Sequence, residues 1–176
     1  MSPCTRTAIS WWPAGWVCGP QPTDGSGLAD AGTVRDLLED LGPTDWFSVT
    51  TGAGACIAPD VGAAMIESKD AAEKYLATLN TAGRRHPVTG VLVAVTADDA
   101  GSIRSTYTDD AAAAADQPVR TKLLQTLDSQ VSRHPYSQLL TATLTTNGSK
   151  LDYDVSARPS TLISMVENRD LPWAFC

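Results

Sequence analysis

Apolar positions recur along this chain with the period of helices in some stretches. Residues 34–41 place Val and Leu on one helix face, and Gly42-Pro43 follows as a stop signal. A second apolar stripe runs over residues 72–79, after a capping residue at Ser68. We predict a third helix that opens at Pro118 and keeps one apolar face as far as Val131, and a short one over residues 160–168. The alanine-rich residues 109–116 are predicted to be a connection.

Other stretches are rich in β-branched and aromatic residues, which predicts strands. They cover residues 46–51 (WFSVTT), 90–96 (GVLVAVT), 103–108 (IRSTYT), 139–146 (LLTATLTT) and 150–155 (KLDYDV). Asn147-Gly148 separates the last two, and Asn-Gly between alternating residues is a strong hairpin signal. In the final strand, apolar residues alternate with Asp152 and Asp154, so the two carboxylates should share its solvent face.

The order of these elements predicts an α+β fold. Short hairpin loops join antiparallel neighbours, so we expect an antiparallel sheet built from hairpins, with helices packed on one face. The 176 residues suit a single domain over 1–176. Within it, residues 1–27 predict an N-terminal hairpin and loop, and residues 88–159 predict a β-β-α-β-β core.

Composition and charge narrow the classes of partner. Apolar residues make up 43% of the chain and charged residues 19%, as in globular proteins. The formal net charge of −7 lacks the basic footprint that direct nucleic-acid binding needs. No run approaches the ~18–20 apolar residues of a membrane span. The acidic excess suits either a basic protein partner or simple solubility, and both interpretations stay open.

The four cysteines, Cys4, Cys18, Cys56 and Cys176, leave the compartment open. An even number permits disulfides, and Cys4 with Cys18 would clip the N-terminal segment. Reduced, buried thiols are the simpler prediction for a chain of this size. Pro13 and Gly15 interrupt the apolar residues 9–17, so these do not resemble a signal peptide. We therefore expect a cytoplasmic protein, with secretion as the alternative.

A search for chemistry yields no catalytic, cofactor-binding or metal site, so we expect a protein that is not an enzyme. His86 and His134 each precede a proline, and neither lies four positions from another residue that could bind a metal. Gly52-Ala53-Gly54 lacks the third glycine of a dinucleotide loop, and no nucleophile elbow or P-loop is present. The alternative is a small enzyme that pairs Cys56 with one of the histidines, since such partners need not be adjacent in sequence.

Paired carboxylates are the remaining candidates, as partner-binding residues. Asp98 with Asp99 and Asp109 with Asp110 stand in predicted connections, where turn chemistry and solubility also explain them. Asp152 and Asp154 differ because they repeat along one strand face. They therefore form a line of negative charge suited to a basic protein surface, or the ordinary solvent face of a half-buried hairpin.

Residues from about 91 to 159 resemble the YezG-like immunity proteins of bacterial polymorphic-toxin systems. The strand pair GVLVAVT and IRSTYT, the segment PVRTKLLQTLDSQV and the hairpin LLTATLTTNGSKLDYDVSARP carry the likeness. Its most specific part is Asn147-Gly148 followed by Leu151-Asp-Tyr-Asp154 and then Pro159. A weaker likeness, over residues 46–76, is to the immunity factor of the mycobacterial necrotizing toxin.

The resemblance implies a bacterial protein that inhibits a cognate protein toxin by stoichiometric binding, without a cofactor. An acidic inhibitor would suit a toxin with a basic surface. Two alternatives remain, which are the small Cys/His enzyme and a secreted effector or structural domain stapled by disulfides.

Overall fold

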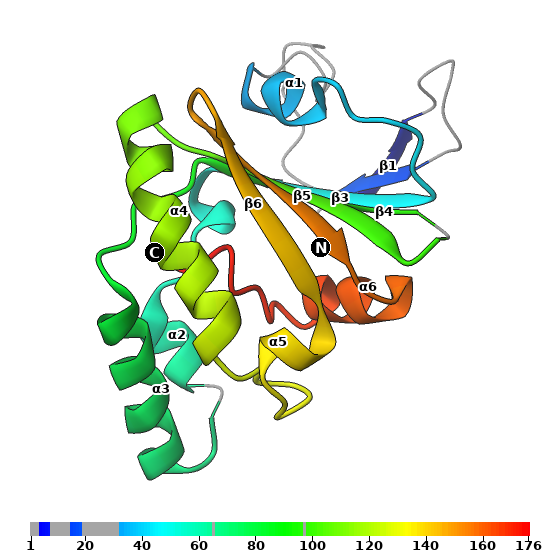
Figure 1. Cartoon of the computed structure of the whole chain (residues 1–176). Helices are drawn as coiled ribbons and strands as arrows, with labels where there is room; N and C mark the ends of the chain where they lie inside the picture. Colours follow the sequence, from blue (N-terminus) through cyan, green and yellow to red (C-terminus); the bar gives the residue numbers. More distant parts are fainter. Residues whose placement is uncertain (1–3, 8–14, 19–31, 65, 97) are drawn as a thin grey trace.

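The computed structural model describes residues 4–7, 15–18, 32–64, 66–96 and 98–176 (Figure 1), with only the backbone of 4–7, 15–18 and Ala53. Its strands are β1 (Cys4–Thr7), β2 (Gly15–Cys18), β3 (Trp46–Thr51), β4 (Gly90–Val95), β5 (Ala100–Thr106), β6 (Thr141–Asn147) and β7 (Lys150–Ser156). Its helices are α1 (Gly32–Leu38), α2 (Pro59–Ala64), α3 (Lys69–Ala82), α4 (Asp110–Thr126), α5 (Tyr136–Leu139) and α6 (Pro159–Glu167), and a 3₁₀ turn, η2 (Gly52–Ala55), follows β3.

Five strands form one antiparallel sheet in the order β3-β4-β5-β7-β6. This confirms the α+β class and the antiparallel sheet. The predicted N-terminal hairpin is present as β1 paired with β2, with Cys4 opposite Cys18. Residues 1–3, 8–14 and 19–27 of the predicted hairpin and loop lie outside the described residues.

The two faces of this sheet differ in what covers them. On the core face Val93, Ile103, Tyr153 and Leu144 lie side by side across four strands and are all buried. Helices α2 to α6 contribute their apolar residues to the same core. The short helix α1 lies on the opposite face, which we call the outer face. There an added Cβ at Gly90 would come within 2.8 Å of the Leu37 side chain.

The helix α4 corrects two predictions. Residues 109–116 are not a connection, because Asp109 caps the helix by accepting a hydrogen bond from the Ala112 amide at 2.8 Å. Alanine has the highest helix propensity, so the run extends the helix upstream of Pro118. Pro118 lies inside the helix with its ring exposed, whereas Val131 is not on the helix face and is half-exposed in the segment after it.

A fully buried ion pair on α4 joins segments that are distant in sequence. Arg120 donates to the Asp116 carboxylate at 2.7 Å, and both side chains are 0% exposed. Asp116 also accepts from the Tyr107 hydroxyl and from the backbone amide of His86. Arg120 in turn donates to the carbonyl oxygens of His86 and Pro172. This pair therefore ties α4 to the end of β5, to the chain before β4 and to the C-terminal segment.

A second buried carboxylate, Asp170, organises the segment after α4. It accepts hydrogen bonds from the hydroxyls of Ser129 and Tyr136 and from the Gln130 amide. The residues that follow it, 171–176, pack into the core, with Trp173 and Phe175 buried. Asp170 thus holds an irregular segment against the C-terminal part of the chain.

The buried pair makes a direct prediction about stability. Arg120→Met leaves the Asp116 carboxylate without its cation, and we expect a loss of about 3–5 kcal/mol in the free energy of unfolding. Lys122→Met, an exposed cation on the same helix, is the matched control and should cost less than about 1 kcal/mol. Urea unfolding followed by circular dichroism measures both. Equal losses for the two variants would contradict this account.

The tyrosines make a second prediction. All four tyrosines of the chain (Tyr75, Tyr107, Tyr136 and Tyr153) are buried. Burial raises the pKa of each phenol above its usual value, and that of Tyr153 to about 12. We therefore expect no phenolate absorbance step near pH 10 in the folded protein, but a four-tyrosine step there in urea.

The same shifts fix the sign of the alkaline stability change. Because each folded pKa lies above the unfolded one, the stabilisation is complete below about pH 10 and is lost as the pH rises toward 12 and beyond. A native sample that titrates its tyrosines at pH 10 while keeping its circular dichroism would show that these side chains are accessible after all.

Candidate functional site

The two aspartate pairs that were predicted in connections lie at opposite ends of the sheet, and the second pair stands at the start of α4. Asp98 and Asp99 are exposed between β4 and β5, and the Asp99 carbonyl accepts from the Ala157 amide just after β7. Asp109 and Asp110 stand at the other end, where Asp110 lies near the β6–β7 turn at Gly148. Strands of seven residues separate the ends by roughly 20 Å, so the two pairs do not form one cluster.

Asp152 and Asp154 lie on the outer face of β7, as their alternation predicted. Asp152 forms an ion pair with Arg104, its cross-strand neighbour on β5, at 2.5 Å. Arg104 also donates to the carbonyl oxygens of Leu37 and Glu39 at the end of α1. Asp152 is therefore already engaged in holding α1 against the sheet.

A second ion pair completes this attachment. Lys150 on β7 binds the Glu39 carboxylate, and this hydrogen-bonded cation lowers the pKa of Glu39 below its usual value. Sequence reasoning missed Arg104, Lys150 and Glu39. The outward positions of Arg104 on β5 and Lys150 on β7 were readable from the alternation within each strand, but nothing local showed that α1 would meet them.

Asp154 has a different environment. It is exposed, and no ion pair engages it within the described part of the chain. Its cross-strand neighbours are Ser102 and Thr143, which are uncharged. The Asp99 backbone bonds to Ala157, three residues beyond Asp154, so Asp98, Asp99 and Asp154 lie toward the same end of the sheet. We call these three carboxylates the acidic end.

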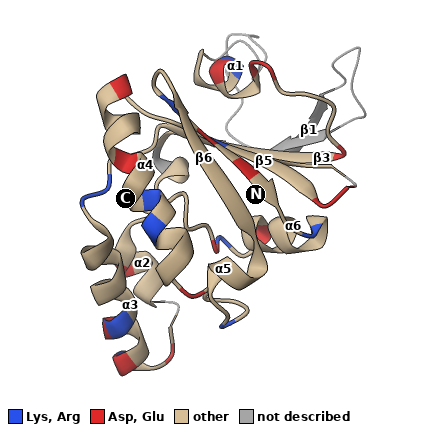
Figure 2. Ribbon diagram, in the orientation of Figure 1, with Lys and Arg blue, Asp and Glu red and all other residues tan. Residues whose placement is uncertain are grey.

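The acidic end borders an uncovered part of the outer face. Helix α1 contacts β3, β4 and β5, whereas the outward side chains of β6 and β7 at Thr143, Thr145 and Ser156 are exposed. Figure 2 shows acidic residues around the ends of the sheet and basic ones on the middle of α4, while α3 carries both. The charge is thus distributed unevenly, and the acidic end offers negative charge on a hydrogen-bonded strand.

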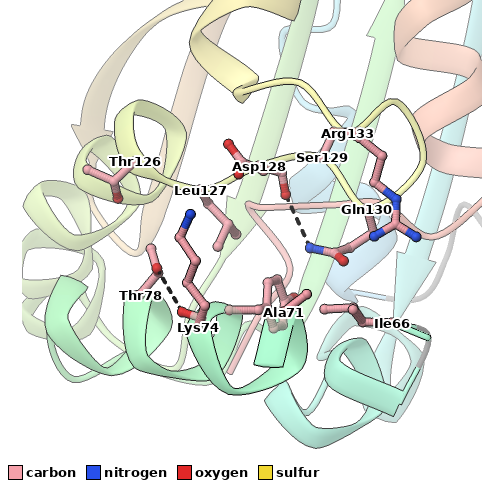
Figure 3. Close-up of a pocket in the computed structure, with 11 residues that line it drawn as sticks. Ile66, Ala71, Lys74, Thr78, Thr126, Leu127, Asp128, Ser129, Gln130 and Arg133 are labelled. Carbon is pink, nitrogen blue, oxygen red and sulfur yellow. Dashed lines mark hydrogen bonds between the residues drawn. The ribbon is translucent and has the colours of Figure 1, made fainter. Parts of the chain in front are cut away.

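A hollow of about 300 Å³ between α3 and the segment after α4 is one of the recessed sites of the described structure (Figure 3). Lys74 extends from α3 toward that segment, and Gln130 and Arg133 extend back toward α3. Asp128 lines the same wall, and Ser129 already donates to Asp170. The hollow suits a small polar molecule, but its walls hold charges of both signs and none of the six candidate aspartates.

Cys56 is bonded to Cys176 in a disulfide, with the two Cα atoms 5.6 Å apart. The prediction of reduced thiols is therefore wrong for these two residues. Spacing gave no signal for this pairing, because 120 positions separate them in sequence. The small-enzyme alternative loses its nucleophile in this state, since a disulfide has no thiolate. His86 contributes its backbone to the buried pair, and His134 is exposed.

Comparison of the chain with protein-family models, with curated proteins and with solved structures finds no match. None of the helices in the described part of the chain combines the length and the apolar character that a membrane span requires. Nor do those residues gather three His, Cys, Asp or Glu side chains in a group that could hold a metal ion.

The disulfide makes a prediction that needs no knowledge of function. A bond that closes so long a loop restricts the unfolded chain, so Cys56→Ala with Cys176→Ala should lose about 3–5 kcal/mol of unfolding free energy. Cys56 and Cys176 should also fail to react with a thiol reagent in denaturant until a reductant is added. Mass spectrometry of the peptides measures the alkylation of each cysteine. Alkylation of both Cys56 and Cys176 without a reductant would contradict the pairing.

Proposed function

We propose that the protein binds and neutralises a cognate protein toxin with a basic surface, as an immunity protein that acts by stoichiometric contact. The observation that carries the proposal is the acidic end, where Asp154, Asp98 and Asp99 stand exposed beside an uncovered strand surface. The resemblance of residues 147–159 to YezG-like immunity proteins supports it, because those residues form β7 and its turn.

Rigidity is what makes this surface suitable for tight binding. Strand β7 is hydrogen-bonded on both sides, to β5 and to β6, and its inward residues Leu151, Tyr153 and Val155 are buried. Asp154 is therefore presented by a backbone that loses little further freedom on binding. An acidic inhibitor also gains in association rate, since opposite charge steers the encounter with a basic partner.

The disulfide favours a second candidate, a secreted domain that binds its partner outside the cytoplasm. Disulfides persist in oxidising compartments and are rare in the cytosol. The contact surface would be the same, but the place of action would differ. Trapping thiols in living cells before lysis separates the two, because a cytoplasmic protein would yield Cys56 and Cys176 reduced.

The test begins with co-expression of the chain and the toxin encoded by the neighbouring gene. We expect protection of the host cell and a one-to-one complex on purification. Asp154→Lys should slow association with the toxin by about tenfold or more at low salt, and the effect should shrink as salt is raised.

The matched control is Asp70→Lys on α3, an equal change of charge at an exposed site far from the acidic end. It should change the association rate by no more than about twofold, through net charge alone. No protection and no complex would remove the immunity proposal. A complex equally sensitive to both substitutions would move the contact away from the acidic end.

A further inference from the structure

Strand β6 forms one edge of the five-stranded sheet, since β7 is its single partner among the described strands. Its turn fixes which backbone groups face outward. Asn147 pairs with Lys150 across a two-residue loop, with positive φ at Gly148 and not at Ser149, as in a type II′ turn. In such a hairpin the bonded pairs alternate from Asn147, so the amides and carbonyls of Ala142, Leu144 and Thr146 point away from β7.

The Leu144 carbonyl confirms this alternation, because it accepts a hydrogen bond from the Gln117 side chain at 2.7 Å and not from β7. Gln117 thereby places α4 beside the edge, and Figure 1 shows the helix running along β6. No backbone bond beyond β7 is formed by Ala142 or Thr146 within the described chain. The edge therefore presents unpaired donors and acceptors, and one carbonyl is held by a side chain.

Apart from α4, whose Gln117 side chain holds one carbonyl, this edge carries none of the other features by which proteins usually prevent strand pairing. Its sequence, TATLTTN, holds no charge and no proline, and it pairs along its whole length with β7 in unbroken register. On the same side of α4 as Gln117, the residues Ala114, Thr121 and Gln125 are uncharged, and Asp110 at the start of the helix is the charged residue of that side. In a chain of net charge −7, β6 and the part of α4 from Ala114 to Gln125 on this side form a neutral strip.

We propose that β6 pairs in antiparallel fashion with β6 of a second copy of this chain, which joins the two sheets into one. Two copies of so acidic a protein repel each other over most of their surfaces, and the neutral strip is where they approach at least cost. A two-fold axis suits an isologous contact, because identical strands are antiparallel when related in this way.

The register follows from the outward groups. With the axis at Leu144, Ala142 lies opposite Thr146 of the partner subunit, and the outward amides and carbonyls meet one another. Thr143 then lies opposite Thr145 of the partner subunit on the outer face, a favourable cross-strand pair. Gln117 must release the Leu144 carbonyl, so its side chain acts as the cap that the second strand replaces.

The experiment is sedimentation of the purified full chain over a range of concentrations, without any toxin. We expect a monomer–dimer equilibrium that tightens as salt screens the repulsion between copies. Thr145→Lys places a positive charge on the β6 edge of each copy, and the two charges come close together in the dimer. The substitution should therefore raise the dimer dissociation constant about tenfold or more. Ser156→Lys makes a similar change on the outer face of the inner strand β7, and should alter it by less than about threefold.

Hydrogen exchange locates the contact. The amides of Ala142, Leu144 and Thr146 should exchange more slowly as the protein concentration rises, whereas other exposed amides should not change. A chain that stays monomeric at high concentration and high salt overturns the proposal, and so does a dimer that weakens equally with both lysine substitutions. Because no toxin takes part, failure here leaves the immunity proposal untouched.

Discussion

The buried contact between Asp116 and Arg120 is the constraint on which the rest of the molecule depends. Removing two charges from water is expensive, and the pair is tolerated because further hydrogen bonds satisfy both groups. Those bonds come from Tyr107, from both backbone groups of His86 and from Pro172. A helix, a strand end, a connection and the C-terminal segment can therefore be satisfied together only in one arrangement.

On the outer face, ion pairs near the surface likewise hold distant segments of the chain together. Arg104 with Asp152 and Lys150 with Glu39 fix α1 over one half of that face. The cations of these pairs are taken up by the fold, and the carboxylates left without a partner among the described residues include Asp154, Asp98 and Asp99. The acidic end therefore consists of carboxylates that the ion pairs of the fold leave unpaired at one end of the sheet. The neutral strip along β6 lies next to it, so two surfaces of different chemistry share one sheet.

Much of the fold could be predicted because it depends on local signals. The alternation in residues 150–155 gave β7 and both of its faces, and the stripe after Ser68 gave α3 with its cap. The start of α4 could not be predicted in this way, because proline favours the first turn of a helix and the alanine run before Pro118 has no apolar periodicity. The buried partners of Asp116 and Asp170, and the pairing of Cys56 with Cys176, arise from contacts between residues distant in sequence. Of the candidate site, the positions of Asp152 and Asp154 were readable, but the neutralisation of Asp152 by Arg104 was not.

The bond between Cys56 and Cys176 turns most of the chain into a closed covalent ring. A single break in any peptide bond inside that ring leaves both pieces attached to each other, so a protease that nicks one surface turn cannot separate the two parts of the core. Both edge strands stay connected as well, since β3 lies just before the ring and β6 within it. In a protease-rich environment, such a molecule would keep its binding surfaces together after damage that would dismantle an open chain.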